Sequence, residues 1–218
     1  MVEYRSDEER LSSIALFFNR NRSVIILITI ACISLASFFS ITKYFENTRN
    51  SAAYEIYDQW IDIISNPDID LNEQAQANQL FKQLYEEYLD TGFGQIALII
   101  RSSNLAENKN LDESLQLLYR LKDNTDGFFG NELFNLIARI GIARIEISLG
   151  NYQNAIDSLE GVKIESDNPM IPHLLGDALA GLNKFESALD HYKQALEIST
   201  LEEEKTIINY KIMQLNTK

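Results

Sequence analysis

Two stretches of this sequence repeat each other at an offset of 33 residues, and this repetition restricts the fold more than any other feature. Residues 143–155 (ARIEISLGNYQNA) align with residues 176–188 (GDALAGLNKFESA). Each copy has a small residue, a turn, an aromatic residue shortly after the turn and a second small residue, and a bulky residue follows four positions later. The candidate packing residues are Ala143, Gly150, Tyr152, Ala155, Leu159, Gly176, Phe185, Ala188, Tyr192 and Ala195.

Two antiparallel helices pack closely only where Ala or Gly lies at their crossing, and aromatic side chains fill the gap to the next pair. The pattern resembles the tetratricopeptide repeat family, whose period is about 34 residues. It departs from that family because every copy lacks the early Trp and because Thr200 stands where a closing Pro is usual. Ankyrin repeats have a similar period but need a Thr-Pro-Leu-His type of turn, which does not occur in this sequence.

A weaker third copy lies upstream, with Ser102, Leu111, Ser114 and Leu118 in the corresponding positions. Its offset from the next copy is 41 residues, so we expect an insertion of about eight residues relative to the repeat period. The segment 122–131 (KDNTDGFFGN) is the expected place for the insertion, because it is rich in residues that favour turns.

Helices are also expected outside the three copies. Amphipathic stretches cover residues 54–64 and 71–89 and are separated by Asn66-Pro67-Asp68, a turn signature. Residues 201–215 form a final helix whose first turn carries Glu202 to Glu204, which suits the helix dipole. Its apolar residues are expected to cover the last pair: Leu201, Ile208, Ile212 and Leu215.

The sequence therefore predicts an all-α fold. Residues 43–218 are expected to form a tetratricopeptide-like α-solenoid of antiparallel helix pairs, nine helices in total, that ends in a C-terminal capping helix. Only 12 residues are Gly or Pro, which leaves few places for the tight turns of a many-stranded β-fold.

Residues 23–42 (SVIILITIACISLASFFSIT) carry no charge and predict a transmembrane helix. Twenty helical residues span about 30 Å, the thickness of the hydrocarbon core of a bilayer. A cleaved signal peptide would have a shorter apolar run and a small-residue cleavage site, whereas this run ends in Phe38, Phe39 and Ile41. The single cysteine, Cys32, lies in the middle of the run and is expected to be a small apolar residue. No strong breaker separates the run from residues 54–64, which favours one long helix.

Residues 1–22 are expected to form a short cytoplasmic tail, because four Arg precede the apolar run and only Lys43 and Arg49 follow it closely. Within the tail, one helical face is apolar and favours a short interfacial helix. That face consists of Leu11, Ile14, Ala15, Phe17 and Phe18. The whole net charge of -13 falls on residues 43–218, which are then expected outside the cytoplasm.

The composition argues against several functions. With 19 Lys and Arg against 32 Asp and Glu, the chain is a poor partner for nucleic acid. His173 and Asp177 are four residues apart on one helix, but we expect His173 and His191 to be solvated. The glycines of Gly92-Phe93-Gly94 are expected to open a helix of the array, where they end the preceding helix and let the chain bend. The runs at Glu86 and Glu202 are expected to be solvated faces. No nucleophile elbow, zinc motif or phosphate loop occurs, so we expect no enzyme activity, cofactor, metal or small-molecule substrate.

The combination of anchor and repeats resembles the ancillary SecYEG translocon subunits of bacteria. The likeness rests on FFNRNR before the apolar run, NSAAYEIYDQW after it, DTGFGQIALIIRSSNLAENKNLDESLQLL and the two clear repeats. It implies a single-pass inner-membrane protein with a periplasmic domain that associates with SecYEG, periplasmic chaperones and exported polypeptides. Two alternatives stay open. One is a membrane-anchored scaffold for another envelope assembly, and the other is a receptor whose repeats lie in the cytosol, as in organelle outer membranes.

Overall fold

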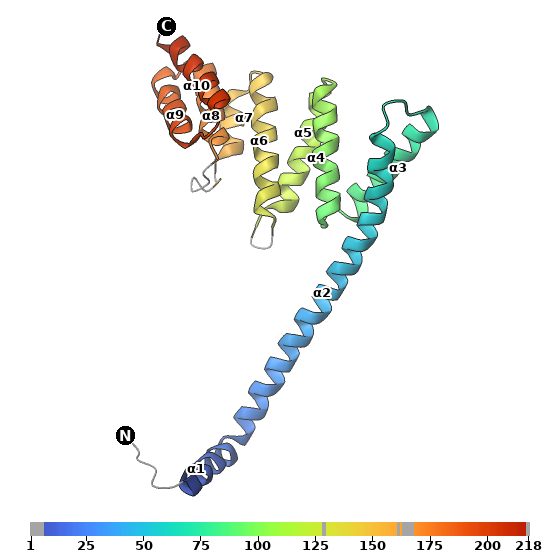
Figure 1. The fold of residues 1–218 in the computed structure, drawn as a ribbon, viewed down its shortest axis with the longest axis vertical. Coiled ribbons are helices and arrows are strands. Elements are labelled where there is room, and N and C mark those ends of the chain that lie inside the picture. Colours follow the sequence, from blue (N-terminus) through green and yellow to red (C-terminus); the bar gives the residue numbers. More distant parts are fainter. Residues whose placement is uncertain (1–6, 128–129, 161, 163–167, 217–218) are drawn as a thin grey trace. The chain divides into compact units, whose positions relative to one another are not determined.

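The computed structural model is helical throughout the residues that it describes, which are 7–127, 130–160, 162 and 168–216 (Figure 1). These residues form ten helices and no strand, which confirms the all-α prediction. The chain divides into two units, Met1–Ala52 and Ala53–Lys218. The helices are α1 (Asp7–Arg20), α2 (Arg22–Ile64), α3 (Leu71–Glu87), α4 (Gly92–Glu107), α5 (Leu111–Thr125), α6 (Glu132–Ser148), α7 (Tyr152–Leu159), α8 (Met170–Gly181), α9 (Phe185–Ile198) and α10 (Glu202–Leu215).

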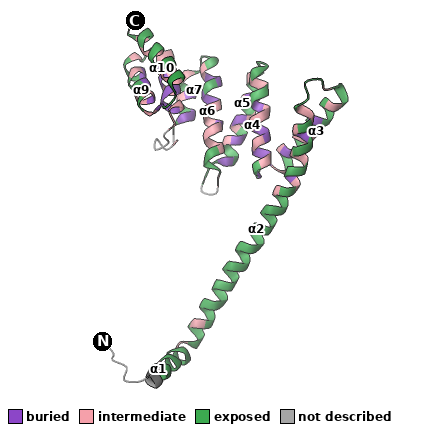
Figure 2. Cartoon of the chain, viewed as in Figure 1, coloured by how far each residue is buried: buried purple, intermediate pink, exposed green. Residues whose placement is uncertain are grey.

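The first unit contains α1 and most of α2. Helix α2 runs for 43 residues without interruption, as predicted, because no Gly or Pro occurs within it. Among the described helices it alone is long and apolar enough to cross a membrane, and protein covers none of its apolar window. Figure 2 shows this part of α2 as exposed. The hydroxyl groups of Thr29 and Ser40 each donate to the carbonyl four residues earlier, at 2.9 Å, so the helix itself satisfies these polar groups, as lipid requires.

The second unit begins with the last turns of α2. Trp60 is 1% exposed and shares a buried cluster with residues of α3 and α4, which are Ala77, Leu84 and Ala97. Helix α3 starts with a capping box, in which the Asp70 carboxylate accepts from the backbone N–H of Glu73 at 2.8 Å. In return, the Glu73 carboxylate accepts from the backbone N–H of Asp70 at 2.9 Å. The same helix α2 thus provides both the candidate span and part of the core of the helical array.

The remaining helices stack as antiparallel pairs, α4 with α5, α6 with α7 and α8 with α9, and α10 packs on α9. The first helix of each pair also meets the first helix of the next, because α6 contacts both α4 and α8. We call the surface that α4, α6 and α8 leave to solvent the first-helix face. This arrangement is the predicted tetratricopeptide-like solenoid with a C-terminal capping helix.

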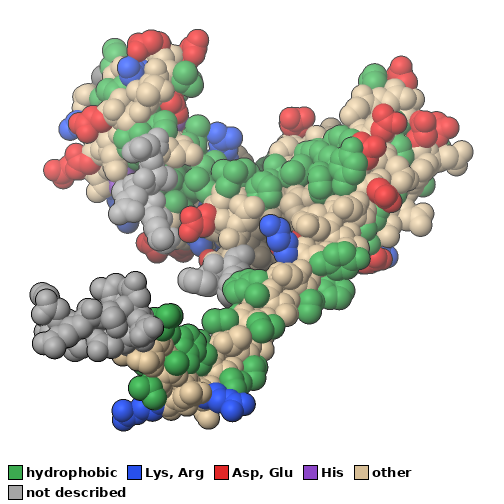
Figure 3. Space-filling model, turned by 60° about the horizontal axis from the view of Figure 1, so that its bottom comes forward, with side chains coloured by type: hydrophobic (Ala, Val, Ile, Leu, Met, Phe, Trp, Pro, Cys, Tyr) green, Lys and Arg blue, Asp and Glu red, His purple; other side chains and the backbone are tan. Residues whose placement is uncertain are grey.

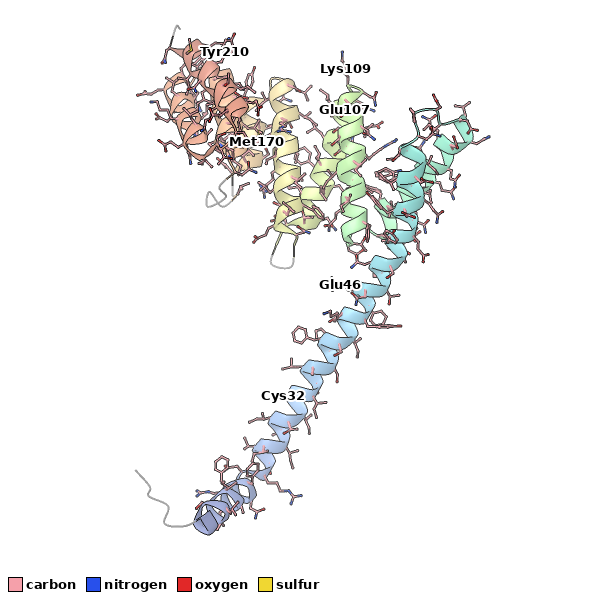
Figure 4. All side chains as sticks on the ribbon, in the orientation of Figure 1. Cys32, Glu46, Glu107, Lys109, Met170 and Tyr210 are labelled. Atoms are coloured by element: carbon pink, nitrogen blue, oxygen red, sulfur yellow. The ribbon has the colours of Figure 1, made fainter. Side chains whose placement is uncertain are left out.

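The turn inside each pair has the same backbone form. Lys109, Gly150 and Asn183 follow α4, α6 and α8 with φ of 63°, 79° and 59°. After each, the next N–H donates to the carbonyl five residues back, as from Asn151 to Glu146 at 2.8 Å, which is the Schellman pattern. The three turns are 41 and 33 residues apart, the offsets of the sequence alignment. Figure 4 labels Lys109 at the first of them.

The structure corrects two boundary expectations. Helix α3 ends at Glu87 and not at Leu89, so it stops before the glycines of Gly92-Phe93-Gly94, which open α4 as expected. A Cβ at Gly94 would collide with the carbonyl of Tyr88, which explains the glycine. Helix α5 continues to Thr125, so helix occupies the start of the predicted insertion at 122–131, of which residues 128–129 lie outside the described residues.

The expected role of Leu201 is also wrong. It precedes α10 as its N-cap residue and is 61% exposed, so it does not cover the last pair. Ile208 is fully buried, and Ile212 and Leu215 pack against the same cluster. The inner face of α10 therefore begins at Ile208, about two turns later than the apolar pattern suggests.

Candidate functional site

The ten predicted packing residues lie in three kinds of place. Ala143, Ala155, Leu159, Ala188, Tyr192 and Ala195 are at most 3% exposed. Gly176 is buried as well, Tyr152 and Phe185 are half-buried, and Gly150 is an exposed turn residue with positive φ. The buried members other than Gly176 belong to two clusters, one around α6, α7 and α8 and one around α9 and α10. These buried residues therefore lie at contacts between helices.

Two tyrosine rings fill the space beside glycines of α8. A Cβ at Gly176 would lie 2.5 Å from Cε1 of Tyr192, so the ring fills the space that the glycine leaves. A Cβ at Gly181 would collide with the ring of Tyr152 from the preceding pair. In the weak third copy, two serines take the place of Ala, and the Ser114 hydroxyl donates to the carbonyl of Ser102 at 2.7 Å. At these crossings, the side chains of one helix thus fit the space that the residues of its partner helix leave.

The expectation that His173 is solvated is wrong. The residue is 8% exposed in the first turns of α8, and neither ring nitrogen has a hydrogen-bond partner. Its Nε2 lies 3.8 Å from Oδ2 of Asp177, so these two residues do come together as their spacing allows. Burial lowers the pKa of His173, and the nearby Lys211 ammonium adds to this effect. His191 is half-buried, and its Nδ1 is buried without a partner.

Asp177 is the centre of a polar cluster that joins the last three helices. Its carboxylate accepts from Nζ of Lys211 in α10, at 2.6 Å, and from the hydroxyl of Tyr192 in α9, at 2.7 Å. Burial, together with the bond to Asp177, raises the pKa of Tyr192, so the phenol stays protonated. The sequence search missed Lys211 because it lies 34 residues from Asp177, about one repeat away, on a helix treated only as a cap. Because each polar partner is engaged between helices, the cluster fastens α10 to the array.

A buried carboxylate lies at the α6–α7 turn. Glu146 is 4% exposed and accepts from the hydroxyl of Tyr119 at 3.1 Å and from the side-chain amide of Asn151 at 2.9 Å. Burial and this bond raise the pKa of Tyr119. Like the Asp177 cluster, it links neighbouring pairs. In the part of the chain that the structure describes, no group of three or more His, Cys, Asp or Glu is placed to hold a metal ion.

One side of α6 stays partly open to solvent, although Ile140 on that side also packs against the cluster of α6, α7 and α8. Leu133 is 62% exposed, Ile137 and Ile140 are half-buried, and Arg144 is exposed, at helical spacing along one face. We call these four residues the α6 stripe. Ile96 of α4 is likewise half-buried on the first-helix face. A helix that is apolar on nearly all sides is normally enclosed, so an open stripe of this kind is a candidate contact surface.

The acidic side chains lie mostly away from the apolar surface. Figure 3 shows hydrophobic side chains gathered over the middle of Ala53–Lys218 and acidic side chains toward its two ends. The predicted acidic runs are surface features, since Glu86 pairs with Lys82 at 3.9 Å and Glu202 with Lys205 at 2.9 Å. The candidate site is therefore the apolar α6 stripe on the stacked helices.

The fold and this surface define a helical-repeat protein with one helix that is suited to cross a membrane. The family described as tetratricopeptide repeat-like domain matches residues 16–217, so the match includes α2 as well as the array. The chain belongs to this family.

Two relatives are similar to this chain. The ancillary SecYEG translocon subunit of Buchnera aphidicola subsp. Acyrthosiphon pisum (strain APS) is 26% identical over 123 residues, which cover 56% of this chain and 62% of that protein, slightly less than two thirds. The ancillary SecYEG translocon subunit of Aggregatibacter actinomycetemcomitans is 22% identical over 191 residues, which cover 88% of this chain and 89% of that protein. The resemblance read from the sequence is confirmed, and neither relative carries the name of an enzyme.

Proposed function

We propose that this chain is a non-catalytic adaptor subunit of chaperone type that associates with the SecYEG translocon and assists exported polypeptides. The observation that carries the proposal is the similarity to two proteins named as ancillary translocon subunits, one of them along 88% of this chain. The layout of α2 supports it, because a helix suited to span the bilayer continues into the repeat array without a linker.

In this proposal, residues 23–42 span the bacterial inner membrane, residues 1–22 stay in the cytoplasm and residues 43–218 lie in the periplasm. The orientation rests on the excess of Arg before the span. Tethering raises the effective concentration of the array at any partner in the same bilayer, which favours a partner such as the translocon. Periplasmic chaperones are further partners on that side.

The α6 stripe is the proposed contact for exported polypeptides. An unfolded segment exposes apolar side chains, and a stripe of Leu133, Ile137 and Ile140 offers them apolar area without enclosing them. Arg144 at the end of the stripe is exposed and its guanidinium lies 3.3 Å from the sulfur of Met170, which Figure 4 labels at the start of α8. Contacts of this kind are weak and tolerant of sequence, as handling of many clients requires.

Site-specific photo-cross-linking in native membranes tests the proposal. A photoreactive residue replaces Ile33 in the span, Leu133 or Ile140 in the α6 stripe, or Leu71, which is 83% exposed at the start of α3 and serves as a matched surface control. Mass spectrometry identifies the adducts. We expect SecYEG from Ile33, exported polypeptides from Leu133 and Ile140, and neither from Leu71.

Other results would redirect or reject the function. Adducts to a different envelope complex, with none to SecYEG, would make the chain a scaffold for that complex. Protease digestion of intact spheroplasts provides the topology control, because periplasmic repeats are cleaved while cytosolic repeats stay protected. Protected repeats would reject the periplasmic role.

A further inference from the structure

The junction of α1 and α2 places two exposed arginines where the chain enters its apolar run. Arg20 is the last residue of α1 and Arg22 is the first of α2, with Asn21 alone between them. The backbone N–H and the side-chain amide of Asn21 both donate to the carbonyl of Phe17, at 3.0 and 2.9 Å. We call Arg20, Asn21 and Arg22 the elbow. Figure 1 shows α1 turning away from α2 at this point.

The length of the apolar run determines the depth at which the elbow lies in a membrane. Residues 23–42 form about 30 Å of helix, which fills the hydrocarbon core of a bilayer. Arg22 directly precedes this segment, so both guanidinium groups of the elbow lie in the headgroup layer when residues 23–42 span the membrane. Helix α1, which ends at the elbow, then ends at the same level and cannot move far from the surface.

The side chains of α1 match that position. Leu11, Phe17 and Phe18 are 66%, 61% and 54% exposed. With the elbow in the headgroup layer, these side chains can reach the apolar interface just below the headgroups. The acidic residues of the tail, Asp7 to Glu9, stand at the opposite end of α1 in the sequence. The elbow itself carries two positive charges and no acidic residue.

We infer that the elbow binds the phosphate headgroups of anionic phospholipids in the surrounding bilayer, with the apolar face of α1 resting in the interface. The planar guanidinium donates two parallel hydrogen bonds to phosphate oxygens, and two such groups flank one residue here. This lipid site goes beyond the proposed adaptor function and does not depend on the translocon.

Lipid selectivity of the purified full-length protein tests the inference. The protein is reconstituted without any translocon in an equimolar mixture of phosphatidylcholine and phosphatidylglycerol. Spin-labelled forms of each lipid then report their relative association with the protein. We expect a preference for phosphatidylglycerol in the wild type and a loss of that preference, by about threefold or more, in R20Q/R22Q.

Two matched variants remove the same number of charges elsewhere. K43Q/R49Q changes the other side of the span, and K82Q/K193Q changes exposed lysines of the array, which are 70% and 64% exposed at their side chains. Both variants should keep most of the preference. An unchanged preference in R20Q/R22Q, or an equal loss in K43Q/R49Q, would overturn the inference. Loss of cross-links to SecYEG with lipid selectivity intact would instead count against the adaptor function alone.

Discussion

Substitution of Gly176 by Ala should destabilise the C-terminal pair, although Ala is the better helix former. The new Cβ would lie 2.5 Å from Cε1 and 2.6 Å from Cδ1 of Tyr192, where ordinary contacts need about 3.5 Å or more. The ring cannot simply shift, because it is 3% exposed and its hydroxyl is bonded to Asp177 at 2.7 Å. Asp177 in turn is bonded to Lys211 of the capping helix.

The expected cost follows from three contributions. Overpacking a filled site costs about 1–3 kcal/mol. If the ring moves, the hydrogen bond to a charged acceptor is strained or lost, for about 1.5–3 kcal/mol. Against these stands the gain of about 1 kcal/mol from replacing Gly by Ala inside a helix. We therefore expect Gly176→Ala to lower the free energy of unfolding by about 2 kcal/mol.

The measurement is urea unfolding of the full chain in detergent, followed by circular dichroism, with hydrogen exchange to locate the effect in α8 to α10. Gly141→Ala is the matched control in α6, because its Cβ would meet only the methyl groups of Leu118, at 3.0 and 3.1 Å, which a rotamer change can move. It should stay within about 0.5 kcal/mol of the wild type.

A double variant sharpens the test. Tyr192→Leu alone leaves a gap beside Gly176 and removes the bond to Asp177, so it should also be destabilising. Combined with Gly176→Ala, the two costs should not add, because the Cβ then occupies vacated space. If Gly176→Ala is as stable as the wild type, or if the two costs add fully, the packing argument is wrong.

Three further outcomes follow from the same contacts. Lys211→Met should raise hydrogen exchange throughout α10 and cost about 3 kcal/mol, since it leaves the carboxylate of Asp177 without its ion pair. Burial lowers the pKa of His173, so the folded state binds fewer protons than the unfolded state. Stability should therefore be full above about pH 6.5, the ordinary pKa of His, and should fall as the pH drops through the lower folded pKa. The difference between the urea midpoints at pH 7 and pH 5 should shrink in His173→Gln. At the turns, Lys109→Gly should stabilise by up to about 1 kcal/mol because φ is 63°, whereas Gly150→Ala should destabilise by about 1 kcal/mol because φ is 79°, both read from thermal unfolding.

The helical array was predictable because its signal is local and periodic. Small residues at a helix crossing and a bulky residue four positions after the second of them recur at fixed offsets, and the turns at Gly150 and Asn183 repeat at one of those offsets. The long helix α2 was predictable for a similar reason, since it contains no residue that breaks a helix. In both cases the information lies within a few turns of chain.

What the sequence did not reveal depends on contacts between distant helices. His173 follows a proline in the first turn of α8, a place that is commonly solvated, yet it is buried beside Tyr192 of α9. Lys211 looks like one more surface lysine until the fold brings it to Asp177. The need for glycine at Gly94 depends on the path of the Tyr88 carbonyl, which no spacing rule contains.

Helix α2 carries two different patterns in one continuous element, and this explains how a single helix can serve both units. From residue 23 to 42 its surface is apolar all round and exposed, as suits a lipid environment. From Ala53 onward the pattern becomes one-sided, with Ala53 and Trp60 buried while Asp58 and Gln59 stay exposed, as suits water on one face and protein on the other. Because the change occurs without a Gly or Pro, the helix that carries the candidate span also forms part of the first pair of the array. In the proposed function, a partner that binds the span therefore binds the same helix whose far end packs in the Trp60 cluster.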